Sequence, residues 1–244
     1  ALARSVFDRV SFDLIYARQD QGVEAWRREL GAALDLGPDH LSLYQLTIED
    51  GTAFGDRAAV GKLAGLPDDD LGADLWALTQ EMTAAAGLPA YEVSNHARAG
   101  QGSRHNLIYW RGGDWGGIGP GAHGRLTLNG RRLATEAVKA PMAWLSAVET
   151  CRTGDADREV MTPLACATEL ALMGLRLAEG MDLDRFRRVS SGIFDINIKH
   201  LVEIGMVRAA GGRLSATAAG QPVLNAVLAR LLDDQPPESA RRMS

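Results

Sequence analysis

The sequence predicts a mixed α/β protein that ends in a small winged-helix-like α+β domain. Two observations support this fold class. Residues 10–46 have the pattern of a strand, a helix and a second strand, which is the spacing of a βαβ unit with parallel strands. Residues 162–220 have the pattern of three helices followed by two short strands around Gly211-Gly212, which is the element order of a winged helix.

The first predicted strand, VSFDLIYA (residues 10–17), carries Asp13 in its middle. Because β-branched and aromatic residues surround it, we expect a buried strand with one charged group. Sites in parallel α/β sheets gather at the carboxyl ends of strands. Tyr16, Gln45 and Thr47 are therefore expected at the opening of such a site, and Asp13 further inside it. A buried carboxylate needs a partner, so Asp13 is either a ligand contact or one half of a structural ion pair.

Residues 49–54 are predicted to form a turn, and a helix is expected from Pro67 with Leu71, Leu75, Leu78 and Met82 on its core face. Residues 90–97, AYEVSNHA, are predicted as the next strand. Candidate site residues there are Glu92, Asn95 and His96. A lone histidine at a strand end is nevertheless more often a solvated surface group.

Residues 105–124, HNLIYWRGGDWGGIGPGAHG, have a composition unlike that of an ordinary helix. Seven glycines favour a tightly turned wall, to which Tyr109, Trp110 and Trp115 would add flat apolar faces. His105 and His123 could offer imidazole nitrogens to a metal or a proton. The same composition also suits a glycine-rich turn whose aromatic residues belong to the core.

A hairpin with a type I′ turn at Asn129-Gly130 is predicted for residues 125–136, and a short helix for 141–150. The polar segment 153–159, TGDADRE, is expected to be a linker between domains. We therefore predict a first domain over residues 1–152, a second over 160–232, and a disordered tail over 233–244.

In the second domain, Thr162 is expected to cap a helix that ends at Gly180 and turns Leu170, Met173 and Leu177 inward. The third helix of this domain offers Lys199 against Asp195 and Glu203. A helix with this charge is poorly suited to a DNA groove.

Composition narrows the possible functions. The chain has 244 residues, 46% apolar and 23% charged, and a formal net charge of −5, so nucleic acid is not an expected partner. No apolar run reaches the roughly 18 residues that a membrane-spanning helix needs, and no signal-peptide pattern is present at the start. We therefore expect a cytoplasmic protein without a transmembrane segment.

The two cysteines, Cys151 and Cys166, fit neither a disulfide scaffold nor the ligand set of a zinc or iron–sulfur site. The sequence starts with Ala1 rather than methionine, just before a predicted strand. We therefore expect a C-terminal fragment of a longer protein.

Several motifs, in order, resemble the radical S-adenosylmethionine (SAM) family of oxygen-independent coproporphyrinogen III oxidases and their relatives. They are SFDLIYA (11–17), HLSLYQLTIEDGT (40–52), YEVSNHA (91–97), HNLIYW (105–110) and GIGPGAHG (117–124). The HNxxYW form resembles the haem chaperone (HemW) branch. The resemblance covers residues 5–232. It implies that residues 1–152 are the C-terminal part of a radical SAM partial (β/α) barrel and that 160–232 are the winged-helix-like HemN C-terminal domain.

The resemblance also implies cofactors and contacts. Asp13 and Thr47 fall on positions that contact SAM. Haem would be held by the central stretch, with His105 or, as the alternative, His123 as the iron ligand and with contacts from Asn106, Tyr109, Trp110, Gly119, Gly121 and His123. Its propionates would pair with Arg104, Arg111 or Arg125, because guanidinium groups match carboxylates. The family's [4Fe-4S] cluster needs a CxxxCxxC loop that this sequence lacks, so we expect no cluster on this chain, and no catalytic residue is assigned.

Three functions follow from these patterns. The first is a haem-binding chaperone that handles haem or a porphyrin and could pass it to haem-accepting proteins. The second is a coproporphyrinogen III oxidase that removes hydrogen from propionate side chains by means of a SAM radical. The third is a non-catalytic binding fragment or transcription factor organised by the winged helix. The HNLIYW form favours the first over the second.

Overall fold

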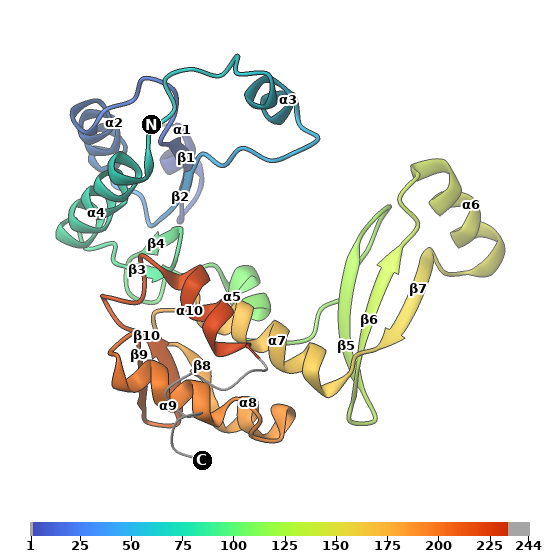
Figure 1. The fold of residues 1–244 in the computed structure, drawn as a ribbon. Helices are drawn as coiled ribbons and strands as arrows, with labels where there is room; N and C mark the ends of the chain where they lie inside the picture. The colour runs from blue at the N-terminus through green and yellow to red at the C-terminus, as the bar shows by residue number, and fades with distance from the viewer. Residues whose placement is uncertain (1, 234–244) are drawn as a thin grey trace. The chain divides into compact units, whose positions relative to one another are not determined.

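The computed structural model describes residues 2–233 and divides into two compact units, Ala1–Ser103 and Arg104–Ser244 (Figure 1). The fold is mixed α/β, as the sequence predicts. This division is not the one expected at residues 153–159, and the predicted domain bounds stay predictions. Of the predicted tail 233–244, all but the first residue lies outside the described residues. In the part of the chain that is described, every helix is too short or too polar to cross a membrane.

The first unit holds one four-stranded sheet, ordered β1-β2-β4-β3, with helices packed on it. Its elements are α1 (Leu2–Val6), β1 (Ser11–Tyr16), α2 (Val23–Asp35), β2 (His40–Gln45), α3 (Ala53–Ala59), α4 (Asp69–Ala85), β3 (Ala90–Glu92) and β4 (Asn95–Ala97).

The predicted βαβ unit is confirmed: β1 and β2 are parallel, with α2 between them in the chain. Helices α2 and α4 lie on one side of the sheet (Figure 1). Trp26, Leu30, Leu75 and Leu78 from these helices pack against Leu41 and Leu43 of β2, and this cluster is the core of the unit.

The structure corrects two expectations about the strands of the first unit. The strand β1 is covered on one face only: its residues alternate, and Asp13 lies on the exposed face while Phe12 and Leu14 face the core. This happens because the helices α2 and α4 cover only one face of the sheet. Residues 90–97 form a hairpin rather than one strand, and β4 runs antiparallel to β2. Residues 49–54 do form a turn, but its end opens the short helix α3, capped by Thr52.

The second unit contains two three-stranded sheets, ordered β5-β6-β7 and β8-β10-β9. Its elements are α5 (Arg104–Trp110), β5 (His123–Leu128), β6 (Arg131–Ala137), α6 (Pro141–Cys151), β7 (Asp155–Val160), α7 (Pro163–Gly174), β8 (Met181–Asp182), α8 (Leu183–Ser190), α9 (Asp195–Glu203), β9 (Val207–Ala210), β10 (Arg213–Ala216) and α10 (Leu224–Leu231).

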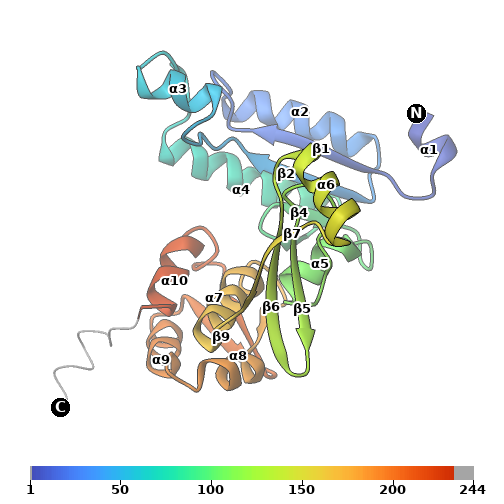
Figure 2. The ribbon, with the colours of Figure 1, turned by 90° about the vertical axis from the view of Figure 1, so that its right-hand side faces the viewer.

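The β5–β6–β7 sheet forms a long antiparallel ribbon with α6 at one end (Figure 2). The predicted hairpin is confirmed, because Asn129 and Gly130 both have the positive φ that a type I′ turn needs. The predicted linker is wrong: most of residues 153–159 belong to β7, which pairs with β6. Its composition resembles that of a linker because β7 is an exposed edge strand, and such a strand is as polar as a linker.

The C-terminal part has the predicted order of three helices and a hairpin, followed by α10. Its core is formed by buried residues between 167 and 231, among them Phe186, Phe194, Leu201 and Leu214. Thr162 caps α7 as predicted, but the helix ends at Gly174 rather than Gly180. The small residues Ala167 and Ala171 are buried on its inner face, which lets neighbouring helices approach closely.

Candidate functional site

The stretch 105–124 consists of three pieces rather than one glycine-rich wall. Residues up to Trp110 form the helix α5, residues 111–122 form a loop, and β5 begins at His123. The expectation that these residues avoid a helix was therefore wrong for the first piece. Arg104–Trp110 contains neither glycine nor proline, the residues least favourable to a helix.

The rings of His105, Tyr109 and Trp115 form a row in which each ring contacts the next. The Tyr109 hydroxyl lies 3.0 Å from Nε2 of His105, one helical turn away, and the two rings meet edge to face. The other side of Tyr109 contacts Trp115, with ring centroids 4.6 Å apart. Trp115 in turn donates a hydrogen bond from Nε1 to the His123 carbonyl. The loop therefore fixes Tyr109, and through it the orientation of His105.

Trp110 and Asn106 are half-buried. The guanidinium carbon of Arg176 lies 4.8 Å from the centre of the Trp110 ring, and α5 contacts α7. A cation over an indole face stabilises the packing of α5 on the C-terminal helices.

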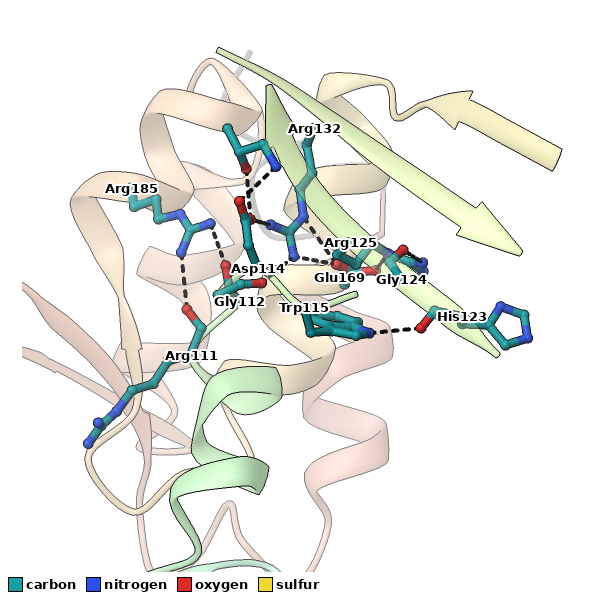
Figure 3. Close-up of polar contacts among 12 residues, drawn as sticks. Arg111, Gly112, Asp114, Trp115, His123, Gly124, Arg125, Arg132, Glu169 and Arg185 are labelled. Carbon is teal, nitrogen blue, oxygen red and sulfur yellow. Dashed lines mark hydrogen bonds and ion pairs between the residues drawn. The ribbon is translucent and has the colours of Figure 1, made fainter. Parts of the chain in front are cut away.

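Figure 3 shows the cluster that holds the loop to the sheet, formed by Arg125, Arg132, Glu169, Asp114 and Trp115. Glu169 of α7 accepts hydrogen bonds from Arg125 of β5, at 2.6 Å, and from Arg132 of β6, at 3.1 Å. Both guanidinium carbons lie 5.7 Å from the centre of the Trp115 ring. The indole is thus held by two cations that share one carboxylate.

Asp114 and Arg185 complete this cluster. Burial alone would raise the pKa of Asp114, but hydrogen bonds from the Thr127 amide and hydroxyl, with the charge of Arg132, hold it below its ordinary value. Arg185 of α8 donates to the carbonyls of Arg111 and Gly112. Burial and the nearby Arg132 lower the pKa of Arg185. These residues were missed by sequence reasoning, because their contacts join distant parts of the chain.

The three arginines expected to bind propionates differ in their contacts. Arg125 is paired with Glu169, and Arg111 forms a two-point ion pair with Glu179. Arg104 is exposed and has no hydrogen bond or ion pair within residues 2–233. Its guanidinium group, next to His105 in the chain, is therefore the one available to a ligand.

The loop carries the candidate glycines and one exposed apolar side chain. Gly119 and Gly121 both have positive φ, and Ile118 beside them is 91% exposed. Gly117 is required for another reason: a Cβ there would lie 2.6 Å from the His123 carbonyl oxygen. The His123 ring is exposed and points away from the arginine cluster (Figure 3).

The first unit presents a polar sheet face opposite its helices. Asp13 lies there beside Ser42, its partner on β2, and within the described residues it forms neither a hydrogen bond nor an ion pair. Thr47 is exposed just after β2. Tyr16, expected at the opening of the site, is instead buried and stacks on Trp26 at 5.1 Å, and burial raises its pKa to about 12.

A hydrogen-bonded chain that sequence reasoning missed crosses this sheet. Nδ1 of His40 lies 2.9 Å from the Ser11 hydroxyl, and Nε2 lies 2.9 Å from the Tyr91 hydroxyl. Burial lowers the pKa of His40. Close by, the buried carboxylate of Glu92 accepts a hydrogen bond from Asn95. These hydrogen bonds hold β2, β3 and β4 together on the face of the sheet that carries Asp13.

His96 is not a solvated surface group, contrary to the sequence-based expectation. It is 1% exposed, and Nδ1 lies 3.0 Å from the Thr83 hydroxyl of α4. Its register partner is Leu41, a core residue, so its ring faces the helices. Burial lowers its pKa to about 4.

A surface depression of about 440 Å³ lies along α7 and includes Met161, Leu164, Leu172 and Glu169. Its lining shares Glu169 with the arginine cluster but contains none of the predicted haem contacts. Cys166, also on α7, is half-buried, and burial raises its pKa; Cys151 is exposed, and neither forms a disulfide.

We predict that Glu169→Gln lowers the free energy of unfolding by about 1–3 kcal/mol, because two mostly buried guanidinium groups lose their shared anion. Urea unfolding at neutral pH measures this. Glu203→Gln is the control, since its partner Lys199 is exposed and 3.9 Å away. Equal stability of the two variants would contradict the role given to Glu169.

His96 makes the stability of the chain depend on pH. Since its pKa in the folded chain, about 4, lies below the ordinary histidine value, the unfolded chain takes up a proton first as the pH falls. The free energy of unfolding therefore has its full value, as far as His96 is concerned, at pH 7. It falls by on the order of 3 kcal/mol as the pH is lowered toward 4. Urea unfolding at several pH values should show this loss, and His96→Phe should abolish it. The exposed His123→Phe should retain it, and the same slope in all three proteins would be evidence against this assignment.

Comparison with known proteins identifies the C-terminal part directly: residues 161–223 match the HemN C-terminal domain family. The chain is 37% identical to the mitochondrial radical S-adenosyl methionine domain-containing protein 1 of Dictyostelium discoideum, over 95% of this chain and 58% of that protein. It is 35% identical to heme chaperone HemW of Mycobacterium tuberculosis, over 93% of this chain and 56% of that protein. The chain thus spans somewhat more than half the length of these curated relatives.

The structure agrees with these identities. It matches the solved structure of coproporphyrinogen III oxidase (HemN) from Escherichia coli, a radical SAM enzyme, with a TM-score of 0.69 over 94% of this chain and 56% of that one. At 18% sequence identity this match shows a common fold, and the fold class implied by the sequence motifs is confirmed. The chain belongs to the radical SAM family that contains the HemW haem chaperones and HemN.

Proposed function

We propose that this chain is the haem-binding part of a HemW-type haem chaperone and that haem is held at the exposed surface of α5 and the loop that follows it. The observation that carries the proposal is the HNLIYW segment, folded as a helix with the imidazole of His105 exposed. The 35% identity to a HemW protein supports the same reading.

The side chains at this surface have the chemistry that haem requires. His105 offers an imidazole, a common ligand of haem iron, and we propose it as the iron ligand. Arg104 offers a guanidinium group to a propionate. Ile118, almost fully exposed in the loop, offers an apolar contact to the flat macrocycle. Asn106, Tyr109, Trp110, Gly119, Gly121 and His123 are proposed as the remaining contacts.

We further propose that Asp13 and Thr47 contact SAM in the complete protein. Both are exposed, and Asp13 is unpaired on the polar face of the sheet, which leaves its carboxylate available to a ligand. A coproporphyrinogen III oxidase remains the alternative function. The comparison with HemN supports it only through the common fold. In the third helix of the winged helix, α9, Lys199 is paired with Glu203 and Asp195 is paired with Arg187. Because Lys199 is already paired with an acidic residue, this helix is a poor binder of DNA phosphates, which supports a function that does not involve nucleic acid. We propose a cytoplasmic location.

We predict that His105→Ala weakens haem binding at least tenfold, because the iron loses its ligand. Titration with haem, followed by the Soret band, measures this. His200→Ala is the control at a half-buried histidine of α9, and His96→Ala tests a buried histidine that we place outside the site. Equal affinity in all variants would move the ligand elsewhere, with His123 the next candidate.

We predict that Arg104→Gln weakens haem binding about two- to fivefold, the range expected for one exposed ion pair. Arg111→Gln should have no effect, since Arg111 is already paired with Glu179. The dimethyl ester of haem, which lacks propionate charges, should bind Arg104→Gln and the unchanged protein equally. A loss of affinity for the ester in Arg104→Gln would show that the arginine acts through folding.

A further inference from the structure

The contact between His105 and Tyr109 uses the nitrogen that a haem iron would need. Nε2 is the ring nitrogen far from the Cβ atom, whereas Nδ1 is next to the ring carbon that carries Cβ. A planar macrocycle that approached Nδ1 would collide with the rest of the side chain. Nε2 lies 3.0 Å from the Tyr109 hydroxyl, within hydrogen-bond distance. In the tautomer in which Nε2 accepts from the hydroxyl, the same lone pair cannot serve the hydroxyl and the iron together.

Of the two partners, His105 is the one free to move. Its side chain is exposed at the start of α5. Tyr109 is half-buried, and its ring is flanked by Trp115 at 4.6 Å between centroids. Trp115 is itself fixed by its hydrogen bond to the His123 carbonyl and by Arg125 and Arg132 over its ring. The hydroxyl therefore has a set position, to which the imidazole can return.

We propose that Tyr109 is a positioning residue whose hydroxyl donates to Nε2 of His105 in the haem-free protein and competes with haem iron for that nitrogen. The inference rests on the proposed haem-binding function. Binding breaks one hydrogen bond and forms one iron–nitrogen bond, without transfer of a proton or an electron. Release reverses this exchange, and the hydroxyl recaptures the imidazole. Tyr109 thus weakens haem binding and favours transfer to an acceptor.

The test uses haem titrations of the whole chain with the variants Tyr109→Phe, His105→Ala and the double variant. Phenylalanine keeps the ring against Trp115 and removes only the hydroxyl. We expect Tyr109→Phe to bind haem about two- to tenfold more tightly, the effect of removing one neutral hydrogen bond that competes. Transfer of haem to apomyoglobin should be slower by a similar factor. In the His105→Ala background the same change should have no effect.

A readout without haem accompanies these titrations. Nitrogen NMR of the His105 ring in the haem-free protein should show Nε2 as the hydrogen-bonded acceptor and Nδ1 as the protonated nitrogen. Tyr109→Phe should shift the Nε2 signal, and Tyr44→Phe, a change at an exposed tyrosine of β2, should leave the spectrum and the affinity unchanged.

The possible results separate the two proposals. If His105→Ala weakens binding and Tyr109→Phe leaves it unchanged or weaker, the competition is overturned while the haem site stands. That result would mean that the hydroxyl supports the ligand rather than opposing it. If His105→Ala leaves haem binding unchanged, both the proposed ligand and the competition are overturned. An Nε2 signal that is the same in Tyr109→Phe and the unchanged protein would also overturn the competition.

Discussion

The carboxylate of Glu169 is the contact on which the arrangement of the second unit depends. It lies on α7 and binds arginines from β5 and β6, so one side chain joins a helix to two neighbouring strands. Glu169 is 13% exposed, and its arginines are 21% and 11% exposed. Charges at this depth are stable only in close pairs, because an unpaired charge would lose its hydration without compensation. The three charges therefore fix one another, and with them the hairpin.

The effect of this cluster reaches the candidate haem site through aromatic contacts. The two arginines hold Trp115, Trp115 holds Tyr109, and Tyr109 holds His105. The arginines, Trp115 and Tyr109 are half-buried, and the last member is the exposed imidazole of His105. Haem can therefore reach the imidazole of His105 from solvent, while the half-buried Tyr109 behind it sets the orientation of the ring. That combination suits a protein that takes up haem and releases it again.

The pairing of charges also decides which groups remain for a ligand. Arg111 and Arg125 are tied to glutamates of the C-terminal helices and their loops, whereas Arg104 keeps its guanidinium group free within the described part of the chain. In the first unit the same logic separates two faces of one sheet. His96 faces the helices and is kept neutral by burial, while Asp13 lies on the opposite, polar face, where its charge stays hydrated.

Elements with local signals could be predicted from the amino-acid sequence. The βαβ unit, the core face of α4, the Asn129-Gly130 turn and the Thr162 cap all follow from residues within a few positions of one another. Contacts between distant segments set the exposure of Asp13, the burial of Tyr16 and His96, and the pairing of Arg125 with Glu169, which lies 44 positions away. The physical reason is that burial and ion pairing depend on which distant segments cover a residue, and periodicity along the chain carries no record of that.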